Sequence, residues 1–199
     1  MKGCRPLKET EYLKIFRALG KGTYGLRNQA LFALGCKAGF RISEMLSLTV
    51  KDVWLNGQLV VEVHVDRTHM KRKIAGRGVV LNPKAGRSLK RWVLEMHSRG
   101  YTRPGEHLFA SQKRKRNGET RPITRNRAWQ IIYQACIEAG VTGKIGTHTM
   151  RKTFATNVYE ATGHSIPKTM EATGHTDVKS LMKYLGYSRA EVEKVILNL

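Results

Sequence analysis

The sequence predicts an α+β fold that is mainly α-helical and includes a small antiparallel β-sheet. Apolar residues recur at helical spacing through most of the chain, whereas the early segment 59–65 places an apolar residue at every second position. The Asn-Gly turn signal at 56–57 comes just before that segment. The chain has 199 residues, enough for one sizeable core, and the basic loop at 111–122 is too short to separate two cores. We therefore expect residues 1–199 to form a single domain.

The N-terminal part is predicted to form two helices and a short third one. Segment 8–19 is amphipathic, and segment 26–38 is apolar enough to be mostly buried and ends before Gly39. Ser43 is the expected N-cap of a short helix that runs through Leu48. The apolar face of the first helix consists of Tyr12, Ile15, Phe16 and Leu19.

The predicted sheet is a hairpin with a basic tip. Its first strand follows the Asn56-Gly57 turn, and its second strand is the short apolar run 79–81. The stretch between them, 67–78, is rich in lysine and arginine. The apolar positions of the first strand are Leu59, Val61, Val63 and Val65.

From Pro83 onward the chain is predicted to be largely helical. Helix 84–98 carries an apolar stripe, and helix 124–139 begins near Thr124 or Asn126 and ends before Gly140. The stripe consists of Leu89, Trp92, Val93 and Met96. Further helices are expected at 148–161, 166–173, 177–184 and 188–198.

The net charge is +21, from 36 Lys and Arg against 15 Asp and Glu, and the basic residues are spread along the whole chain. A positive folded domain favours a polyanionic partner, because each neutralised phosphate releases counterions. Nucleic acid is therefore the expected partner, ahead of an anionic membrane surface or a domain that is simply basic.

The cysteines suggest a reducing location. Cys4, Cys36 and Cys136 are far apart and form no Cys-x-x-Cys pair, so neither a disulfide framework nor a zinc module is expected. The N-terminal residues do not resemble a signal peptide, and no apolar run is long enough to span a bilayer. We expect a cytoplasmic protein with no metal, no cofactor and no membrane association.

The last third of the chain carries the residues best suited to chemistry. His148 and Arg151 lie three residues apart, so on a helix they project from one face. His175 follows Gly174, and Tyr184 comes nine residues after His175. Together these groups can bind a phosphodiester, move protons around it and attack it with a phenolate.

Arg41 offers a second guanidinium at the mouth of a predicted helix. Two arginines can clamp both non-bridging oxygens of one phosphate and stabilise the charge that grows in the transition state. The alternative for Arg41 is an ion pair with Glu44, three residues further on.

Arg151 and Tyr184 have structural alternatives as well. Arg151 lies beside residues that face the core, where a guanidinium needs a partner, and a salt bridge to Glu160 or Glu171 would supply one. Tyr184 can be a tyrosine that packs between helices, and Tyr187 is a rival nucleophile.

These motifs together resemble those of the tyrosine recombinases, the phage integrase family. Residues 39–44, Gly-Phe-Arg-Ile-Ser-Glu, resemble box I of that family, and His148-Thr-Met-Arg151 matches its His-x-x-Arg. Gly174-His175 matches the Gly-His that follows, and Tyr184, unlike Tyr187, lies at the spacing of the family's nucleophile. The resemblance implies the fold of the family's catalytic domain.

The resemblance also implies an activity. Such proteins are site-specific DNA recombinases that cut and rejoin strands through a 3′-phosphotyrosyl bond, without ATP or metal. Carried over, Tyr184 is the nucleophile, and Arg41 and Arg151 hold the phosphate. His148 assists proton transfer, and His175 donates a hydrogen bond to the phosphate.

The family's general acid is a lysine in the β-hairpin, and this chain has two candidates there. Lys71 is favoured by its place relative to the returning strand, which leaves Lys73 as a contact to DNA. Arg125 and Arg127 open the helix that the resemblance turns towards DNA, where arginines can read guanine edges or touch phosphates.

Family members usually carry a separate N-terminal DNA-binding domain, and the residues before box I leave no room for one. We therefore expect a minimal recombinase or a catalytic fragment of prokaryotic, viral or mobile-element origin. It would act on double-stranded DNA as a dimer or tetramer, and segment 188–199 would dock on a neighbouring subunit or on its own core. The alternatives are a type IB topoisomerase-like nicking-closing enzyme and a non-catalytic DNA-binding regulator on the same fold.

Overall fold

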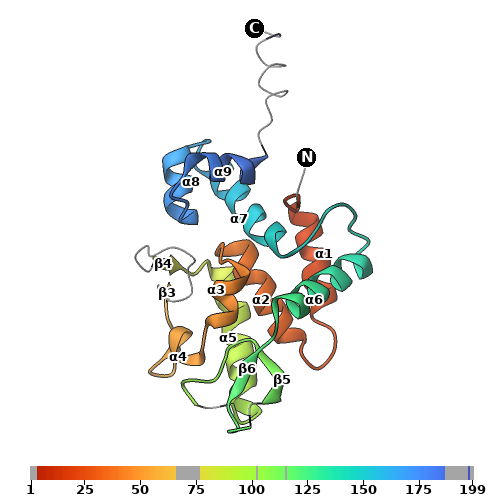
Figure 1. Ribbon diagram of the computed structural model, residues 1–199, viewed down its shortest axis with the longest axis vertical. Coiled ribbons are helices and arrows are strands. Elements are labelled where there is room, and N and C mark those ends of the chain that lie inside the picture. The colour runs from red at the N-terminus through yellow and green to blue at the C-terminus, as the bar shows by residue number, and fades with distance from the viewer. Residues whose placement is uncertain (1–3, 66–76, 102, 115, 187–196, 198–199) are drawn as a thin grey trace.

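The structure is a computed structural model that describes residues 4–65, 77–101, 103–114, 116–186 and 197 (Figure 1). Its helices are α1 (Glu9–Leu19), α2 (Gly25–Lys37), α3 (Ile42–Ser47), α4 (Val50–Val53), α5 (Pro83–Ser98), α6 (Arg125–Glu138), α7 (Thr147–Ala161), α8 (Ile166–Thr173) and α9 (Val178–Leu185). Its strands are β1 (Trp54–Leu55), β2 (Gln58–Leu59), β3 (Glu62–Val65), β4 (Arg77–Val80), β5 (Ala110–Arg114) and β6 (Thr120–Pro122). The mainly helical architecture is the one that the sequence predicts.

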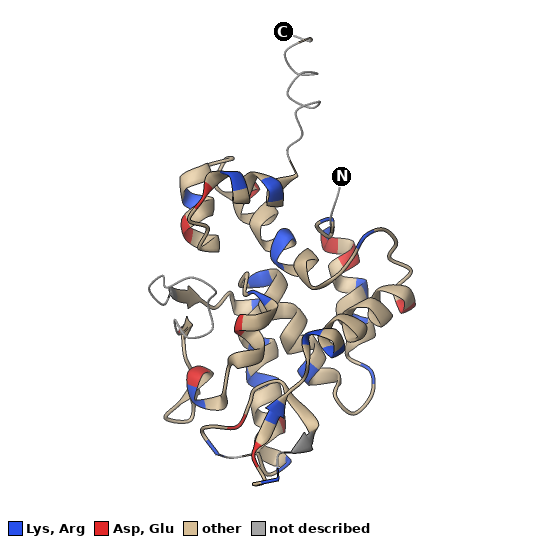
Figure 2. Cartoon of the chain, in the orientation of Figure 1, with Lys and Arg blue, Asp and Glu red and all other residues tan. Residues whose placement is uncertain are grey.

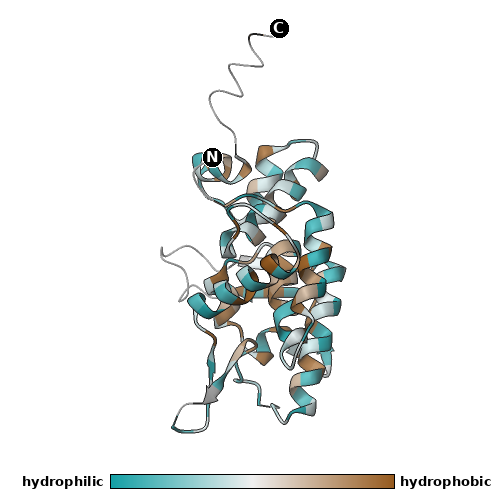
Figure 3. Cartoon of the chain, turned by 90° about the vertical axis from the view of Figure 1, so that its right-hand side faces the viewer, coloured by the Kyte–Doolittle hydropathy of each residue, from teal (hydrophilic) through white to brown (hydrophobic). Residues whose placement is uncertain are grey.

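Helix α2 lies at the centre of the helical body and packs against α1, α3, α5 and α7 (Figure 1). The run from Ala30 to Leu34 is completely buried in it, as expected for a helix without a strong polar face. Helix α5 buries the whole predicted stripe against α2, and α1 buries Tyr12, whose ring stacks on Phe32 of α2 at 5.1 Å between centroids. Apolar residues therefore gather where the helices meet (Figure 3).

Within the described residues, the strands pair as three two-stranded antiparallel sheets. The β1–β2 hairpin turns at Asn56 and Gly57, which both adopt positive φ, as this type of tight turn requires. The β3–β4 pair is the predicted basic hairpin, with Val63 opposite Val79. Residues 66–76, which include Lys71 and Lys73, lie outside the described residues.

Three local predictions are wrong. The alternation does not form one strand, because Val61 is 78% exposed and lies between β2 and β3. The loop 111–122 contains the β5–β6 hairpin, whose turn has Gly118 at φ 80° and the Asn117 side chain accepting from the Glu119 N–H. Arg41, rather than Ser43, is the N-cap of α3, because the buried Glu44 carboxylate accepts the Arg41 backbone N–H and so begins the helix two residues earlier.

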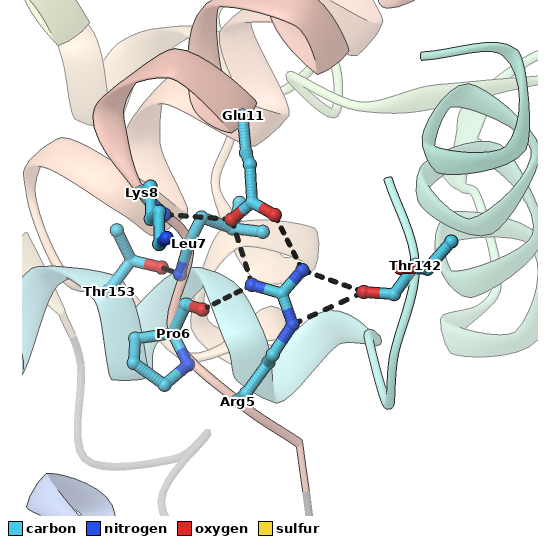
Figure 4. A network of polar contacts seen from close by, with 7 residues as sticks. All are labelled: Arg5, Pro6, Leu7, Lys8, Glu11, Thr142 and Thr153. Carbon is cyan, nitrogen blue, oxygen red and sulfur yellow. Dashed lines mark hydrogen bonds and ion pairs between the residues drawn. The ribbon is translucent and has the colours of Figure 1, made fainter. Parts of the chain in front are cut away.

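The N-terminal segment is tied to α7 (Figure 4). Arg5 donates to both carboxylate oxygens of Glu11 in α1, at 2.8 and 2.6 Å, and to the Thr142 carbonyl oxygen just before α7. The backbone N–H of Leu7 donates to Oγ1 of Thr153 in α7 at 2.9 Å. The Leu7–Thr153 bond joins the start of the chain to the helix that carries His148 and Arg151.

None of the helices in the described part of the chain is both long enough and apolar enough to cross a membrane.

Candidate active site

Helices α7, α8 and α9 pack against one another at one end of the molecule and supply most of the candidate residues (Figure 1). His148 and Arg151 lie in the first turns of α7, Tyr184 lies in α9, and His175 lies in the turn that joins α8 to α9. Arg41 comes from the segment that joins α2 to α3.

Arg151 is buried, with 2% of its surface exposed, and its guanidinium connects two distant segments. Its Nη1 donates to the carbonyl oxygen of Gly39, and its Nη2 donates to the carbonyl oxygen of Thr173. Gly39 lies two residues before Arg41, and Thr173 lies two residues before His175. Arg151 thus ties the backbone that carries Arg41 to the backbone that carries His175. The partners expected for a purely structural arginine, Glu160 and Glu171, are both exposed.

Gly39 can hold this position because it has no side chain. Its φ is 70°, in the left-handed region, and a Cβ atom there would collide with the ring of Phe154 in α7. The chain therefore passes close to α7, and the Gly39 carbonyl can meet Arg151.

Arg41 forms the ion pair that the alternative interpretation predicts. Its Nη1 donates to Oε1 of Glu44 at 2.7 Å, and the other carboxylate oxygen accepts the Arg41 backbone N–H at 2.7 Å. The Arg41 side chain is still 40% exposed, whereas that of Glu44 is 1% exposed. Since a guanidinium has five N–H donors, this pair orients Arg41 and leaves donors for an anion.

The Gly-His pair has a clear structural basis. Helix α8 ends with Gly174 at φ 64°, the Gly174 N–H donates to the Glu171 carbonyl, and the His175 N–H donates to the Met170 carbonyl at 3.1 Å. This is the Schellman arrangement, which reverses the chain direction at a glycine. It places His175 back against the end of α8.

Tyr184 lies between the two histidines. Its hydroxyl oxygen is 3.3 Å from Nδ1 of His148, and its ring meets the His175 ring edge-on at 5.0 Å between centroids. Helix α9 holds it there: Asp177 caps the helix by accepting from the Lys179 and Ser180 N–H groups, and Leu181 is completely buried. The hydroxyl hydrogen bond from Ser180 is the main reason why the pKa of Asp177 lies below its usual range.

One residue of this site is not predicted from the sequence. Oγ1 of Thr173 is 2.6 Å from Nδ1 of His175, and Thr173 is completely buried. The contact depends on the left-handed turn at Gly174, so the spacing of Thr173 and His175 alone does not reveal it. The Gly-His pair itself is the only sequence signal that points to such a turn.

Arg125 and Arg127 lie in the first turn of α6, and both are exposed. Thr124 caps the helix by accepting the Arg127 N–H at 3.0 Å. Lysines and arginines also occur on most of the other elements (Figure 2). Lys71, Lys73, Tyr187 and the apolar residues of segment 188–199 on which docking is predicted lie outside the described residues, so these predictions stay predictions.

Cys36 and Cys136 are buried in α2 and α6. Burial raises the pKa of the Cys36 thiol well above its usual range and that of Cys136 to about 11, so both remain protonated at neutral pH. Among the residues that the structure describes, no group of three His, Cys, Asp or Glu side chains is arranged to hold a metal ion.

Comparison with known proteins identifies the class of protein to which the fold and this cluster of Arg, His and Tyr side chains belong. A family model described as "Phage integrase family" matches residues 5–191. The chain therefore belongs to the phage integrase family.

Relatives with names include integrases and recombinases. The chain is 32% identical over 163 residues to the probable integrase/recombinase YoeC of Bacillus subtilis (strain 168), a match that covers 80% of this chain and 77% of YoeC. It is 28% identical over 170 residues to the tyrosine recombinase XerD of Oceanobacillus iheyensis, which covers 84% of this chain and 52% of XerD. The chain thus spans about half the length of the XerD protein.

Solved structures confirm the fold. The XerA recombinase matches with a TM-score of 0.72 at 20% identity, over 99% of this chain and 66% of XerA. The XerH recombinase, bound to its difH substrate in a pre-cleavage complex, matches with a TM-score of 0.69 at 23% identity, over 98% of this chain and 55% of XerH. The predicted fold of a tyrosine recombinase catalytic domain is therefore confirmed.

Proposed function

We propose that this chain is a DNA strand transferase that cuts and rejoins DNA through a phosphotyrosyl bond at Tyr184, as a site-specific recombinase does. One observation carries the proposal: the Tyr184 hydroxyl lies 3.3 Å from Nδ1 of His148, beside the His175 ring. Arg151 links these groups to the segment that carries Arg41. A nucleophile, a proton acceptor and cationic donors are therefore available to one phosphate.

The chemical step follows from this arrangement. The Tyr184 oxygen attacks the phosphorus, and the phenolic proton passes to Nδ1 of His148, which is within reach when it carries the lone pair. The bond between phosphorus and the 5′ oxygen breaks, and that oxygen takes a proton from a hairpin lysine, Lys71 or Lys73. Arg41, Arg151 and His175 stabilise the charge on the phosphate oxygens. A 5′-hydroxyl then reverses the step.

The charge of the chain supports DNA as the substrate. The net charge is +21, and Arg125 and Arg127 lie exposed on the first turn of α6. The solved relatives include XerH bound to its difH substrate and a lambda integrase dimer bound to a core site, the latter with a TM-score of 0.66 at 16% identity. We extend the proposal to a dimer or tetramer of this chain on DNA, with Lys73, Arg125 and Arg127 as DNA contacts.

Covalent capture on a nicked suicide substrate tests the proposal. Wild-type protein should form a DNA adduct that survives a denaturing gel, and Tyr184→Phe should form none while binding the same DNA in a mobility-shift assay. Tyr187→Phe is the matched control and should form the adduct. An adduct in the Tyr184→Phe variant would exclude Tyr184, and no adduct with the wild-type protein on any DNA that it binds would favour a regulator without chemistry.

The product distinguishes recombination from nicking and closing. A supercoiled plasmid that carries two copies of the captured site should yield recombined circles. Relaxed plasmid without exchanged segments would instead indicate the topoisomerase-like alternative.

A further inference from the structure

Thr173, the last residue of α8, contacts Arg151 and His175. These are two of the three side chains that the proposed mechanism places on the phosphate. The Thr173 carbonyl oxygen accepts a hydrogen bond from Nη2 of Arg151. Its hydroxyl oxygen lies 2.6 Å from Nδ1 of His175. Since Thr173 is completely buried, water cannot replace either contact readily.

The hydroxyl has a second partner that decides which atom carries each proton. Oγ1 of Thr173 lies 2.6 Å from the carbonyl oxygen of Thr169, one turn earlier in α8. A carbonyl oxygen can only accept, and a threonine hydroxyl has one hydrogen to give. That hydrogen goes to the Thr169 carbonyl, which lies closer than the Met170 carbonyl at 3.4 Å. The hydroxyl can then only accept from His175, so Nδ1 of His175 carries a proton.

The proton on Nδ1 determines what the other ring nitrogen can do. In the neutral ring Nε2 keeps its lone pair, and in the charged ring Nε2 is an N–H donor. With Nδ1 held by Thr173, a charged His175 ring can donate from Nε2 to a phosphate oxygen. A histidine held by its second nitrogen in this manner is fixed both in orientation and in tautomer.

We propose that Thr173 is a positioning residue for strand transfer, whose hydroxyl holds His175 with Nδ1 protonated and Nε2 directed to the scissile phosphate. The inference rests on the proposed function and adds a residue that the expected catalytic set does not contain. Through its carbonyl, the same residue also holds Arg151, so one turn of backbone sets the positions of two phosphate ligands.

Thr169 provides a matched control in the same helix. It is also completely buried, and its hydroxyl donates to the Ser165 carbonyl at 2.7 Å, the same one-turn bond that Thr173 makes. Among the residues that the structure describes, no histidine contacts its hydroxyl. Thr169→Val therefore removes only a hydrogen bond within α8. Thr173→Val removes the equivalent bond within α8 together with the contact to His175.

The first test compares initial rates of covalent capture on the nicked substrate. Thr173→Val should slow capture about tenfold, as expected when one hydrogen bond that orients a reacting group is lost. Thr173→Ser keeps the hydroxyl and should restore the rate to within about twofold, and Thr169→Val should stay within the same range. Equal rates for wild type and Thr173→Val, or an equal loss in Thr169→Val, would overturn the proposal.

The second test does not need an active enzyme. Nitrogen-15 NMR of the wild-type protein, with the His175 signals assigned from their loss in His175→Gln, reports which ring nitrogen is protonated. A neutral ring that carries its proton on Nδ1 supports the proposal, and a neutral ring that carries its proton on Nε2 overturns it. Failure of the wild-type protein to capture DNA would count against the proposed function, while this measurement would still test the Thr173–His175 hydrogen bond.

Discussion

The carbonyl oxygen of Gly39 accepts a hydrogen bond from the buried guanidinium of Arg151, 112 residues further along the chain. This contact joins the first arginine motif to the second, because Gly39 precedes Arg41 by two residues and Arg151 lies in the His-x-x-Arg segment. The glycine of the first motif therefore has a physical role: it lets the backbone approach α7 closely enough for its carbonyl to hold Arg151.

Gly39→Ala should damage both stability and activity. The positive φ alone costs an alanine about 1 kcal/mol, and the collision of its Cβ with Phe154 adds about 1–3 kcal/mol or moves the segment. A displaced carbonyl releases Arg151, so covalent capture should fall about tenfold or more.

Gly100→Ala is the control for this prediction, because Gly100 has φ 81° and none of the described residues places an atom within 4 Å of its missing Cβ. It should lose about 1 kcal/mol of stability and keep its rate of capture. Thermal unfolding and capture rates measure both effects. Equal behaviour of the two variants would contradict the role of Gly39.

Glu44→Gln should distinguish the two effects of Glu44, its support of the start of α3 and its orientation of the Arg41 side chain. The glutamine oxygen can still accept the Arg41 backbone N–H, so we expect a loss of stability of only about 1 kcal/mol. The charged contact to Nη1 is lost, however, and Arg41 becomes free to rotate. The rate of covalent capture should therefore fall by more than the small loss of stability explains. An unaltered capture rate would show that Glu44 acts only at the start of α3.

The general acid can be identified with a leaving group that needs no proton. Lys71→Ala and Lys73→Ala are each tested on normal DNA and on DNA with a 5′-bridging phosphorothiolate at the scissile position. We expect Lys71→Ala to be inactive on the normal substrate and rescued on the sulfur substrate, because a thiolate leaves without protonation. Rescue confined to Lys73→Ala would move the assignment to Lys73.

The Arg5–Glu11 pair predicts an acid-sensitive contribution to stability. The hydrogen bonds from Arg5 lower the pKa of Glu11 from 4.5 to about 2. A carboxyl group whose pKa is lowered on folding stabilises the fold above its unfolded pKa, and the contribution is lost as the pH falls from about 4.5 to about 2.

Glu11→Gln should therefore destabilise the protein by about 1 kcal/mol at pH 7, and the difference from wild type should shrink towards pH 2. Urea unfolding at several pH values measures it. Glu138→Gln is the control, since its pair with Lys21 is 3.8 Å long and exposed, and it should have little effect at any pH. A difference between wild type and Glu11→Gln that does not change with pH would contradict the prediction.

Local patterns were sufficient to predict most of the helices. The stripe from Leu89 to Met96 is buried as its spacing indicates, and α6 is capped by Thr124, one of the two residues expected near its start. The local errors have local causes. At α3 the carboxylate of Glu44 accepts the Arg41 backbone N–H, so the helix begins before Ser43. At 111–122 the basic composition hides an Asn117-Gly118 turn.

Contacts between distant segments could not be read from the sequence. The order of Arg41, His148, Arg151, His175 and Tyr184 predicted the candidate site, and the structure connects these residues by a chain of contacts. Two of the connecting atoms are backbone carbonyl oxygens, those of Gly39 and Thr173, which carry no sequence signal of their own. The hydroxyl of Thr173 reaches His175 only because Gly174 turns the chain. The extent of the domain and the roles of Lys71 and Lys73 stay predictions.

Mapping the DNA-linked residue tests the central claim most directly. The covalent complex formed on nicked DNA is digested with nuclease and protease, and the nucleotide-bearing peptide is sequenced by mass spectrometry with fragment ions that separate Tyr184 from Tyr187. The proposed mechanism predicts a nucleotide attached through its 3′ phosphate to the Tyr184 oxygen. A nucleotide on Tyr187 or any other residue, or one attached through a 5′ phosphate, would contradict it.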